Sequence, residues 1–130
     1  MPWGVCSVPA HDGWCGRTMY LQEGAPWGSV YQCHLEHYGH PAKFGYKGLI
    51  PLRKAEKWDA AALARYFNEI GARYIVAVAV HHDNFDNHDS TYQPWNSVRK
   101  DCEFRRDVIL SVSERRKGSG NASNLFCLQE

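Results

Sequence analysis

The stretch "KWDAAALARYFNEIGARYIVAVAV" (57–80) is the clearest indication of the fold, because it predicts a helix followed directly by a buried strand. Asp59 stands at an N-cap position, where its carboxylate can accept hydrogen bonds from the free amides of a first helical turn. Residues 60–64 are all alanine or leucine, which are strong helix formers. The apolar residues that follow recur at the helical spacing i, i+3, i+4 and i+7, namely Leu63, Tyr66, Phe67 and Ile70. Gly71 is expected to end this helix.

The segment after the helix, residues 74–80, is apolar and rich in β-branched side chains. It is apolar on both faces, which is typical of a strand that is covered on both sides in a parallel sheet. A helix followed by such a strand is half of a βαβ unit. The sequence therefore predicts an α/β fold.

Two histidines, His81 and His82, open the polar run "HHDNFDNHD" (81–89) where the strand is expected to end. In parallel α/β folds the carboxyl ends of the strands carry the chemistry. Position alone leaves two interpretations open. The pair lies in a binding cleft, or it is a hydrogen-bonded pair that ties down a loop.

A metal site has less support from the same run. Adjacent residues of an extended strand point to opposite faces, so His81 and His82 cannot easily share one ion. The aspartates Asp83, Asp86 and Asp89 lack the glycine that a calcium loop needs for its sharp turn. We therefore expect no metal ion.

Length, charge and hydropathy exclude several classes of protein. A chain of 130 residues indicates one domain, and its net charge of +1 argues against binding to nucleic acid through phosphate neutralisation. The longest apolar run, residues 74–80, is too short to cross a membrane. No signal peptide is visible, so the compartment stays unassigned. The five cysteines form no C-x-x-C motif, which gives a zinc ribbon little support and leaves their pairing open.

Several short blocks of the sequence carry a family resemblance. In chain order they are "WGVCSVPA" (3–10), "WCGRTMY" (14–20), "FGYK" (44–47), "AEKWD" (55–59), "HHDNF" (81–85), "PWNSV" (94–98) and "RRD" (105–107). From about Trp3 to Asp107 the chain resembles the N-terminal part of the catalytic domain of α-L-fucosidases, glycoside hydrolase family twenty-nine.

The resemblance implies a fold and an activity. The family folds as a (β/α)8-like barrel followed by a β-sandwich, so we expect a partial (β/α)8 TIM-like barrel. Residues 1–107 would form the N-terminal portion of the barrel and residues 108–130 an unassigned tail. The family releases terminal α-linked L-fucose with retention, using a carboxylate nucleophile and a carboxyl acid/base. The implied partner is a fucosylated oligosaccharide or glycoconjugate, and no cofactor is implied.

The resemblance also assigns roles to three residues. His81 and His82 match a histidine pair that hydrogen-bonds fucose hydroxyls. Trp14 matches an aromatic residue that lines the pocket, where an indole offers a rigid surface to an apolar sugar face. Without the flanking match, core packing would be the favoured explanation for Trp14 alone.

Four positions depart from the family pattern. Pro2 stands where the family has a histidine, and Gly13 stands where it usually has a glutamate, so two expected sugar contacts are missing. Cys15 and His88 replace residues that are usually aromatic, which alters the expected shape of the pocket.

A complete (β/α)8 barrel needs about 250 residues, so we expect this chain to be a fragment. The nucleophile and the acid/base are expected downstream, no catalytic carboxylate is assigned, and the isolated chain is predicted to be inactive. The alternative is a non-catalytic remnant or a weak fucose-binding module. Residues 108–130 begin apolar and then reach "ERRKGSGNASN" (114–124), a basic and small polar stretch that is expected to form a frayed tail. We expect His34, His37 and His40 to be surface residues.

Overall fold

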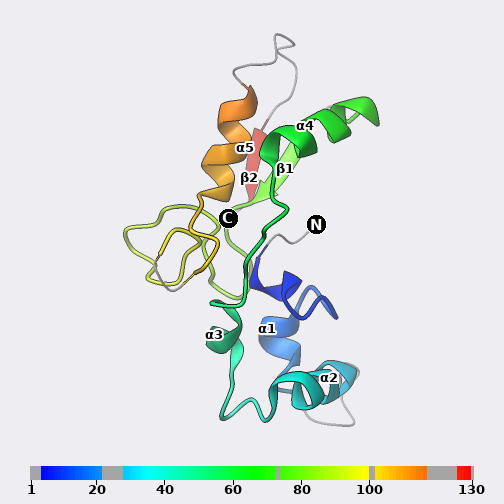
Figure 1. Cartoon of the computed structure of the whole chain (residues 1–130), viewed down its shortest axis with the longest axis vertical. Coiled ribbons are helices and arrows are strands. Elements are labelled where there is room, and N and C mark those ends of the chain that lie inside the picture. Colours follow the sequence, from blue (N-terminus) through cyan, green and yellow to red (C-terminus); the bar gives the residue numbers. More distant parts are fainter. Residues whose placement is uncertain (1–3, 22–27, 73, 100–101, 117–125, 130) are drawn as a thin grey trace.

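The computed structural model describes residues 4–21, 28–72, 74–99, 102–116 and 126–129 (Figure 1). Its elements, in chain order, are the 3-10 helix η1 (Val5–Ser7), the helices α1 (Cys15–Thr18), α2 (Gly28–Tyr38), α3 (Tyr46–Leu49) and α4 (Ala60–Glu69), the strand β1 (Ile75–Val78), the helix α5 (Val108–Arg116) and the strand β2 (Phe126–Gln129). Among these described residues, no helix has the length and hydropathy that a membrane crossing requires.

The predicted helix and its two boundaries are confirmed in α4. The Asp59 carboxylate accepts hydrogen bonds from the backbone N–H groups of Ala61 and Ala62, at 2.8 and 3.0 Å. Gly71 follows the helix with a φ of +82°, a left-handed conformation that costs glycine little because it has no Cβ. Local chemistry therefore sets both ends of α4.

The predicted parallel arrangement is also present. Strands β1 and β2 pair in parallel, with Ile75 opposite Phe126 and Val78 opposite Gln129. The chain between them contains α5, which packs against α4 beside the two strands (Figure 1). The succession β1, α5, β2 is thus a βαβ unit, the repeat from which parallel α/β folds are built.

The expectation of a frayed tail is wrong for residues 114–116, which belong to α5, while residues 117–124 lie outside the described residues. Residues 126–129 form β2. The start of α5 has a clear local signal in the "RRD" block (105–107), which the family resemblance places at the opening of a helix. The Asp107 carboxylate accepts from the backbone N–H of Leu110 at 2.7 Å, which is an N-cap like that of α4. Val108 and Val112, one helical turn apart, are both buried.

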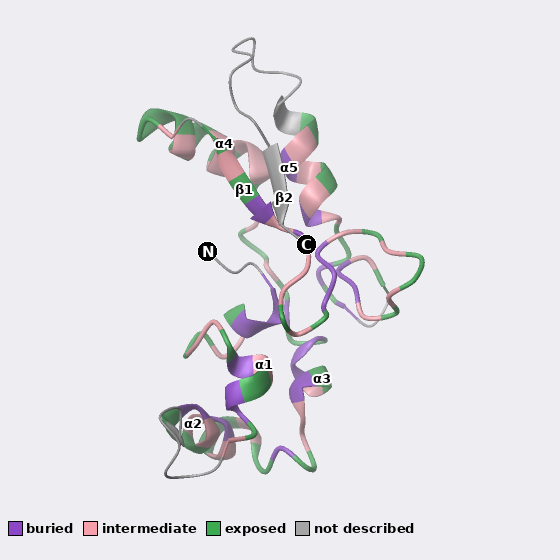
Figure 2. Cartoon of the chain, turned by 180° about the vertical axis from the view of Figure 1, so that it is seen from behind, coloured by how far each residue is buried: buried purple, intermediate pink, exposed green. Residues whose placement is uncertain are grey.

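The expectation that β1 is covered on both faces is wrong in the described chain. Ala77 is fully buried, but Val76 is 42% exposed. The apolar stripe of α4 is not buried either, since Tyr66 is 56% and Ile70 is 60% exposed (Figure 2). The reason is geometric: burial of such a strand requires packed elements on both faces of a sheet, and β1 has β2 as its only sheet neighbour among the described residues.

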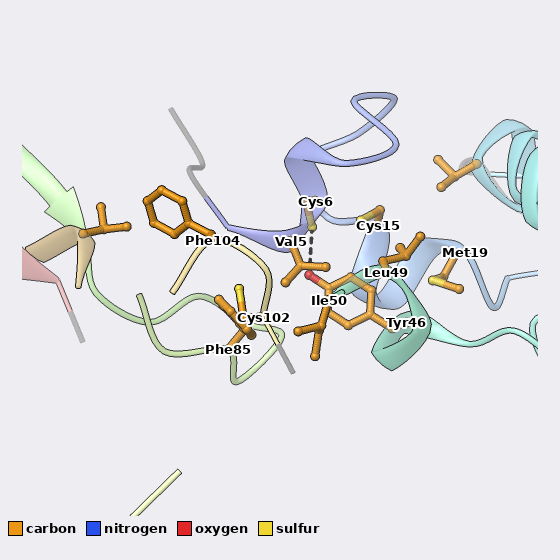
Figure 3. Close-up of a cluster of buried hydrophobic side chains, with 12 residues drawn as sticks. Val5, Cys6, Cys15, Met19, Tyr46, Leu49, Ile50, Phe85, Cys102 and Phe104 are labelled. Atoms are coloured by element: carbon orange, nitrogen blue, oxygen red, sulfur yellow. Dashed lines mark hydrogen bonds between the residues drawn. The ribbon is translucent and has the colours of Figure 1, made fainter. Parts of the chain in front are cut away.

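Most of the hydrophobic core lies beside η1, α1 and α3 (Figure 3), and it extends through Phe104 to Val108 at the start of α5. Its fully buried side chains include Val5, Met19, Leu49 and Phe85, and Phe85 comes from the loop after β1. This loop is therefore anchored to the N-terminal helices by its own aromatic residue.

Two polar residues in this region are buried as well. The Arg53 guanidinium is stacked 5.5 Å from the Phe85 ring and 4.7 Å from the Phe104 ring. His34 is only 4% exposed, and its Nε2 lies 2.7 Å from the Phe44 carbonyl oxygen. The expectation that His34 is a surface residue is therefore wrong, because the helix turns this ring toward the core.

Candidate functional site

The loop at the carboxyl end of β1 is closed by hydrogen bonds to the strand itself. The backbone N–H of Asn87 donates to the Ala79 carbonyl at 2.7 Å, and its side-chain Nδ2 donates to the Val78 carbonyl at 3.1 Å. At the tip, the N–H of Asn84 donates to the His81 carbonyl at 2.9 Å. Asn84 has a φ of +55°, a left-handed conformation that asparagine tolerates better than most residues. The loop therefore holds the histidine pair at the strand end, where the sequence predicted it.

His81 and His82 face each other instead of pointing to opposite sides. Their Nδ1 atoms lie 2.6 Å apart, and their ring centroids are separated by 4.3 Å at an interplanar angle of 74°. The expected divergence is wrong because β1 ends at Val78, so the pair is not part of an extended strand. A hydrogen bond between two Nδ1 atoms requires that one carries the proton and the other accepts it.

The protonation state of His81 follows from its surroundings. Burial lowers the pKa of His81 below its ordinary value of 6.5, and the positive charge that His82 can carry lowers it further. Nearby Asp83 opposes this shift. His81 is therefore held in its neutral form, in which one ring nitrogen donates and the other accepts.

Trp14 completes the cluster. Its ring stacks on His82 with centroids 4.4 Å apart and an interplanar angle of 26°, and it lies 5.6 Å from the His81 ring. The indole is 53% exposed, and its backbone carbonyl accepts from the Arg17 and Thr18 amides at the start of α1. The structure thus brings together the three residues singled out in the sequence, which we call the imidazole–indole face (Trp14, His81 and His82).

A polar contact beneath this face ties the histidine loop to α3. The Tyr46 hydroxyl donates a hydrogen bond to Asp83 Oδ2, while Asp83 Oδ1 accepts from the Phe85 amide at 3.1 Å. Burial raises the pKa of Tyr46, and the hydrogen bond to Asp83 raises it further. A Cβ placed on Gly16 would lie 3.1 Å from the Cβ of Asp83, so α1 approaches the loop closely where it has glycine.

The sequence predicted no role for Tyr46, and it raised Asp83 only as a calcium ligand that the missing glycine argues against. Tyr46 lies in the "FGYK" block, so the family resemblance contained a signal for it. The contact itself joins residues 37 positions apart, which no local pattern reveals.

The four positions that depart from the family pattern lie in different surroundings. Gly13 precedes Trp14 directly and offers no side chain to the face. Cys15 is turned into the core and is 1% exposed. His88 lies with its Nε2 3.8 Å from Asp86 Oδ2. Pro2 lies outside the described residues.

The imidazole–indole face offers groups that can bind a ligand rather than a group that can react with one. In the part of the chain that the structure describes, no three His, Cys, Asp or Glu side chains gather closely enough to hold a metal ion. An exposed indole beside two imidazoles supplies an apolar surface together with hydrogen-bond donors and acceptors. This combination suits a ligand with one apolar face and several hydroxyl groups, such as a sugar.

Comparison with known proteins extends the resemblance. The family model described as Alpha-L-fucosidase matches residues 1–124, and so runs past residue 107. Tissue alpha-L-fucosidase of Rattus norvegicus is 31% identical over 107 residues, which are 82% of this chain and 22% of that protein. The Homo sapiens tissue enzyme is 32% identical with the same coverage.

Solved structures agree with the sequence comparison. The crystal structure of Thermotoga maritima alpha-fucosidase matches with a TM-score of 0.75 at 26% identity, covering 96% of this chain and 30% of that one. The same enzyme in complex with fucose matches with a TM-score of 0.73 at 27% identity, covering 97% and 30%. This chain spans less than a third of each of these relatives. It belongs to the alpha-L-fucosidase family.

Proposed function

We propose that this chain carries a fucose-binding portion of an α-L-fucosidase catalytic domain, in which the imidazole–indole face contacts a terminal L-fucose residue of a glycoconjugate. The observation that carries the proposal is the convergence of Trp14, His81 and His82 at the carboxyl end of β1. The β1–α5–β2 unit would form part of a (β/α)8 barrel, whose strand ends carry the binding residues.

The chemistry of the face supports a sugar as the ligand. A neutral His81 can donate to one hydroxyl group or accept from it, because neutral imidazole has one nitrogen of each kind. The half-exposed indole can pack against the apolar face of the ring. Together they would distinguish fucose from sugars whose hydroxyl groups point elsewhere, since a mismatched sugar leaves polar groups unpaired.

Hydrolysis by this chain alone is not part of the proposal. Retaining hydrolysis needs two carboxyl groups about 5–5.5 Å apart across the glycosidic bond. Asp83, which adjoins the face, has one oxygen bonded to Tyr46 and the other to the Phe85 amide. Asp59 and Asp107 cap helices. We therefore propose that the isolated chain binds but does not cleave.

Binding is tested by an NMR titration of the purified chain with L-fucose. We expect the imidazole signals of His81 and His82 and the indole signal of Trp14 to shift together and to saturate. L-Rhamnose, a 6-deoxy sugar with a different arrangement of hydroxyl groups, should shift them less. If both sugars produce equal shifts, or neither shifts these signals, the proposed specificity is wrong.

Two histidine variants separate a direct contact from a general effect. His82→Ala removes one hydrogen bond worth about 0.5–1.5 kcal/mol, so the dissociation constant for fucose should rise about 2- to 12-fold. His37→Ala is the matched control, because His37 lies on α2, at the opposite end of the molecule from β1 (Figure 1). The control variant should bind fucose like the unaltered chain.

Turnover of an aryl α-L-fucoside tests the second half of the proposal. We expect no release of the aryl group above the rate in buffer. A rate that survives re-purification and is lost in His82→Ala would contradict the statement that the chain binds without cleaving.

A further inference from the structure

Asn87 is buried at the base of the loop that carries the two histidines, where three segments of the chain meet. Its side chain is 1% exposed. Its backbone N–H and its side-chain Nδ2 donate to the carbonyl oxygens of Ala79 and Val78, at 2.7 and 3.1 Å. Its own carbonyl oxygen accepts from the backbone N–H groups of Val108 and Ile109, at 2.9 and 3.4 Å. One residue therefore joins the end of β1, the histidine loop and the first turn of α5 (Figure 1).

The two bonds from Asn87 to β1 fix the direction in which the chain leaves the strand. A single hydrogen bond would let the base of the loop pivot about the line that joins donor and acceptor. Two bonds to the carbonyl groups of consecutive residues, one of them from a side chain, oppose this rotation. His81 comes two residues after Ala79, so the direction of the backbone at Ala79 determines where both imidazoles start.

The first turn of α5 holds the same loop from the other side. Asp107, whose Oδ1 caps α5, also accepts from the Asp89 backbone N–H through Oδ2, at 2.9 Å. Together with the bonds to the Asn87 carbonyl, this contact attaches residues 87–89 to the start of the helix. The base of the loop is thus bound to a strand and to a helix, and Asn87 is the residue that takes part in both attachments.

The side chain of Asn87 adds less to stability than its burial suggests. In the described part of the chain its Oδ1 has no hydrogen-bond partner, whereas Nδ2 has one. A buried carbonyl oxygen that lacks a partner costs at least as much free energy as one neutral hydrogen bond contributes. Leucine has the same shape and would fill the space without this cost. Stability therefore gives no reason for an amide at this position.

We propose that Asn87 is a positioning residue for the imidazole–indole face, which orients His81 and His82 toward a bound sugar through its two bonds to the end of β1. This inference rests on the proposed function. Asn87 acts through the loop backbone, since its own side chain is too deeply buried to touch a ligand. A Cβ placed on Gly4 would lie 3.9 Å from both Asn87 Nδ2 and Asp83 Oδ2, so the amide lies near the carboxylate that supports the face.

Two variants of the full chain separate positioning from general stability. Asn87→Leu keeps the shape of the side chain and removes both the bond to Val78 and the unpartnered oxygen. Asn96→Leu is the matched control, because Asn96 is also 1% exposed. The amide of Asn96 makes four hydrogen bonds, all within residues 90–99 and none to a histidine. The control variant therefore loses more bonds at a position that does not hold the imidazoles.

NMR spectra of the imidazole nitrogens provide a readout that a purely structural role would not change. The bond between the two Nδ1 atoms gives its donor and its acceptor different nitrogen shifts, and the stacked Trp14 ring displaces the His82 ring protons upfield. In Asn87→Leu we expect both effects to decrease. The dissociation constant for L-fucose should rise about 2- to 12-fold, the range for one lost hydrogen bond. The urea midpoint should stay close to that of the unaltered chain.

The control should behave in the opposite way, with a lower urea midpoint and unchanged imidazole signals. The proposal is overturned if the imidazole signals stay unchanged in Asn87→Leu, or if they shift in both variants in proportion to the lost stability. Where Asn87→Leu does not fold, Asn87→Ala is measured instead, and failure of both to fold would show a purely structural role.

Asn96→Asp replaces the control if Asn96→Leu does not fold, because a carboxylate still accepts from two backbone amides. Absence of fucose binding in the unaltered chain would refute the proposed function. The imidazole spectra would still decide whether Asn87 positions the two rings, so the two failures are distinguishable.

Discussion

The substitution Tyr46→Phe removes one hydroxyl group from the base of the imidazole–indole face. Tyr46 is 9% exposed, and its hydroxyl donates to the Asp83 carboxylate in the same loop as His81 and His82. The phenylalanine ring keeps the packing of the tyrosine ring, so no cavity is created. The variant therefore isolates the hydrogen bond that links α3 to the histidine loop.

A hydrogen bond to a charged acceptor contributes about 1.5–3 kcal/mol to stability. Asp83 is half-buried and keeps its bond to the Phe85 amide, so we expect a loss in the lower part of this range, about 2 kcal/mol. The entropy of unfolding is about 2.1 cal/mol/K per residue, or about 0.27 kcal/mol/K for 130 residues. The melting temperature should consequently fall by about 7 °C.

The assay is equilibrium unfolding in urea, followed by circular dichroism, with a thermal melt as a second measurement. With a slope of about 2 kcal/mol/M, the urea midpoint should fall by about 1 M while the slope stays unchanged. Tyr92→Phe is the matched control, because Tyr92 is 98% exposed and loss of its hydroxyl should change stability by less than about 0.5 kcal/mol.

A double-mutant cycle identifies the partner. Asp83→Asn weakens the same bond, so its effect and that of Tyr46→Phe should not add. If Tyr46→Phe is as stable as the Tyr92 control, or if the two losses add fully, the bond does not anchor the loop and the reasoning is refuted.

Substitutions at three other positions give distinct readouts. His82→Ala should raise the pKa of His81 in an NMR titration, because the ring that helps to bury it and the charge that repels its proton are both lost. The folded chain holds the pKa of His81 below 6.5, so the unfolded chain binds this proton more readily. The free energy of unfolding should therefore decrease as the pH drops through 6.5. This decrease should be smaller in His82→Ala. Asp59→Ala should lower the free energy of unfolding in urea by about 1 kcal/mol, because the N-cap of α4 is lost. Asp59→Asn should retain most of this stabilisation, because asparagine also caps helices. Gly71→Ala should cost about 1–2 kcal/mol in the same assay because of its φ of +82°, and a neutral result would contradict the cap assignment.

The helix and strand of residues 57–80 were predictable because their signals are local. An N-cap carboxylate, a run of helix formers and a terminal glycine act within one or two turns of the backbone, and all three operate in α4. The capping signal at Asp107 is equally local, and it lies in the "RRD" block (105–107) of the family resemblance.

The burial of these elements was not predictable in the same way. The apolar stripe of the helix and the two apolar faces of the strand indicate which surfaces can be covered, but their coverage depends on what the rest of the chain places against them. Val76 and Tyr66 have the expected apolar character and still remain largely exposed. Phe85, from a loop that the sequence marked as polar, is instead one of the most buried side chains.

The candidate site likewise has features that are local in the sequence and features that depend on tertiary contacts. Sequence alone determined that His81 and His82 come directly after a parallel strand and, through the resemblance, that Trp14 belongs with them, because motif order and strand ends are recorded along the chain. The tertiary structure brings the two imidazoles face to face, stacks the indole on one of them, and places the Tyr46 hydroxyl against both Asp83 and Cys6. These contacts depend on the path of the backbone between distant segments, and a linear pattern with a period of two or four residues carries no information about that path.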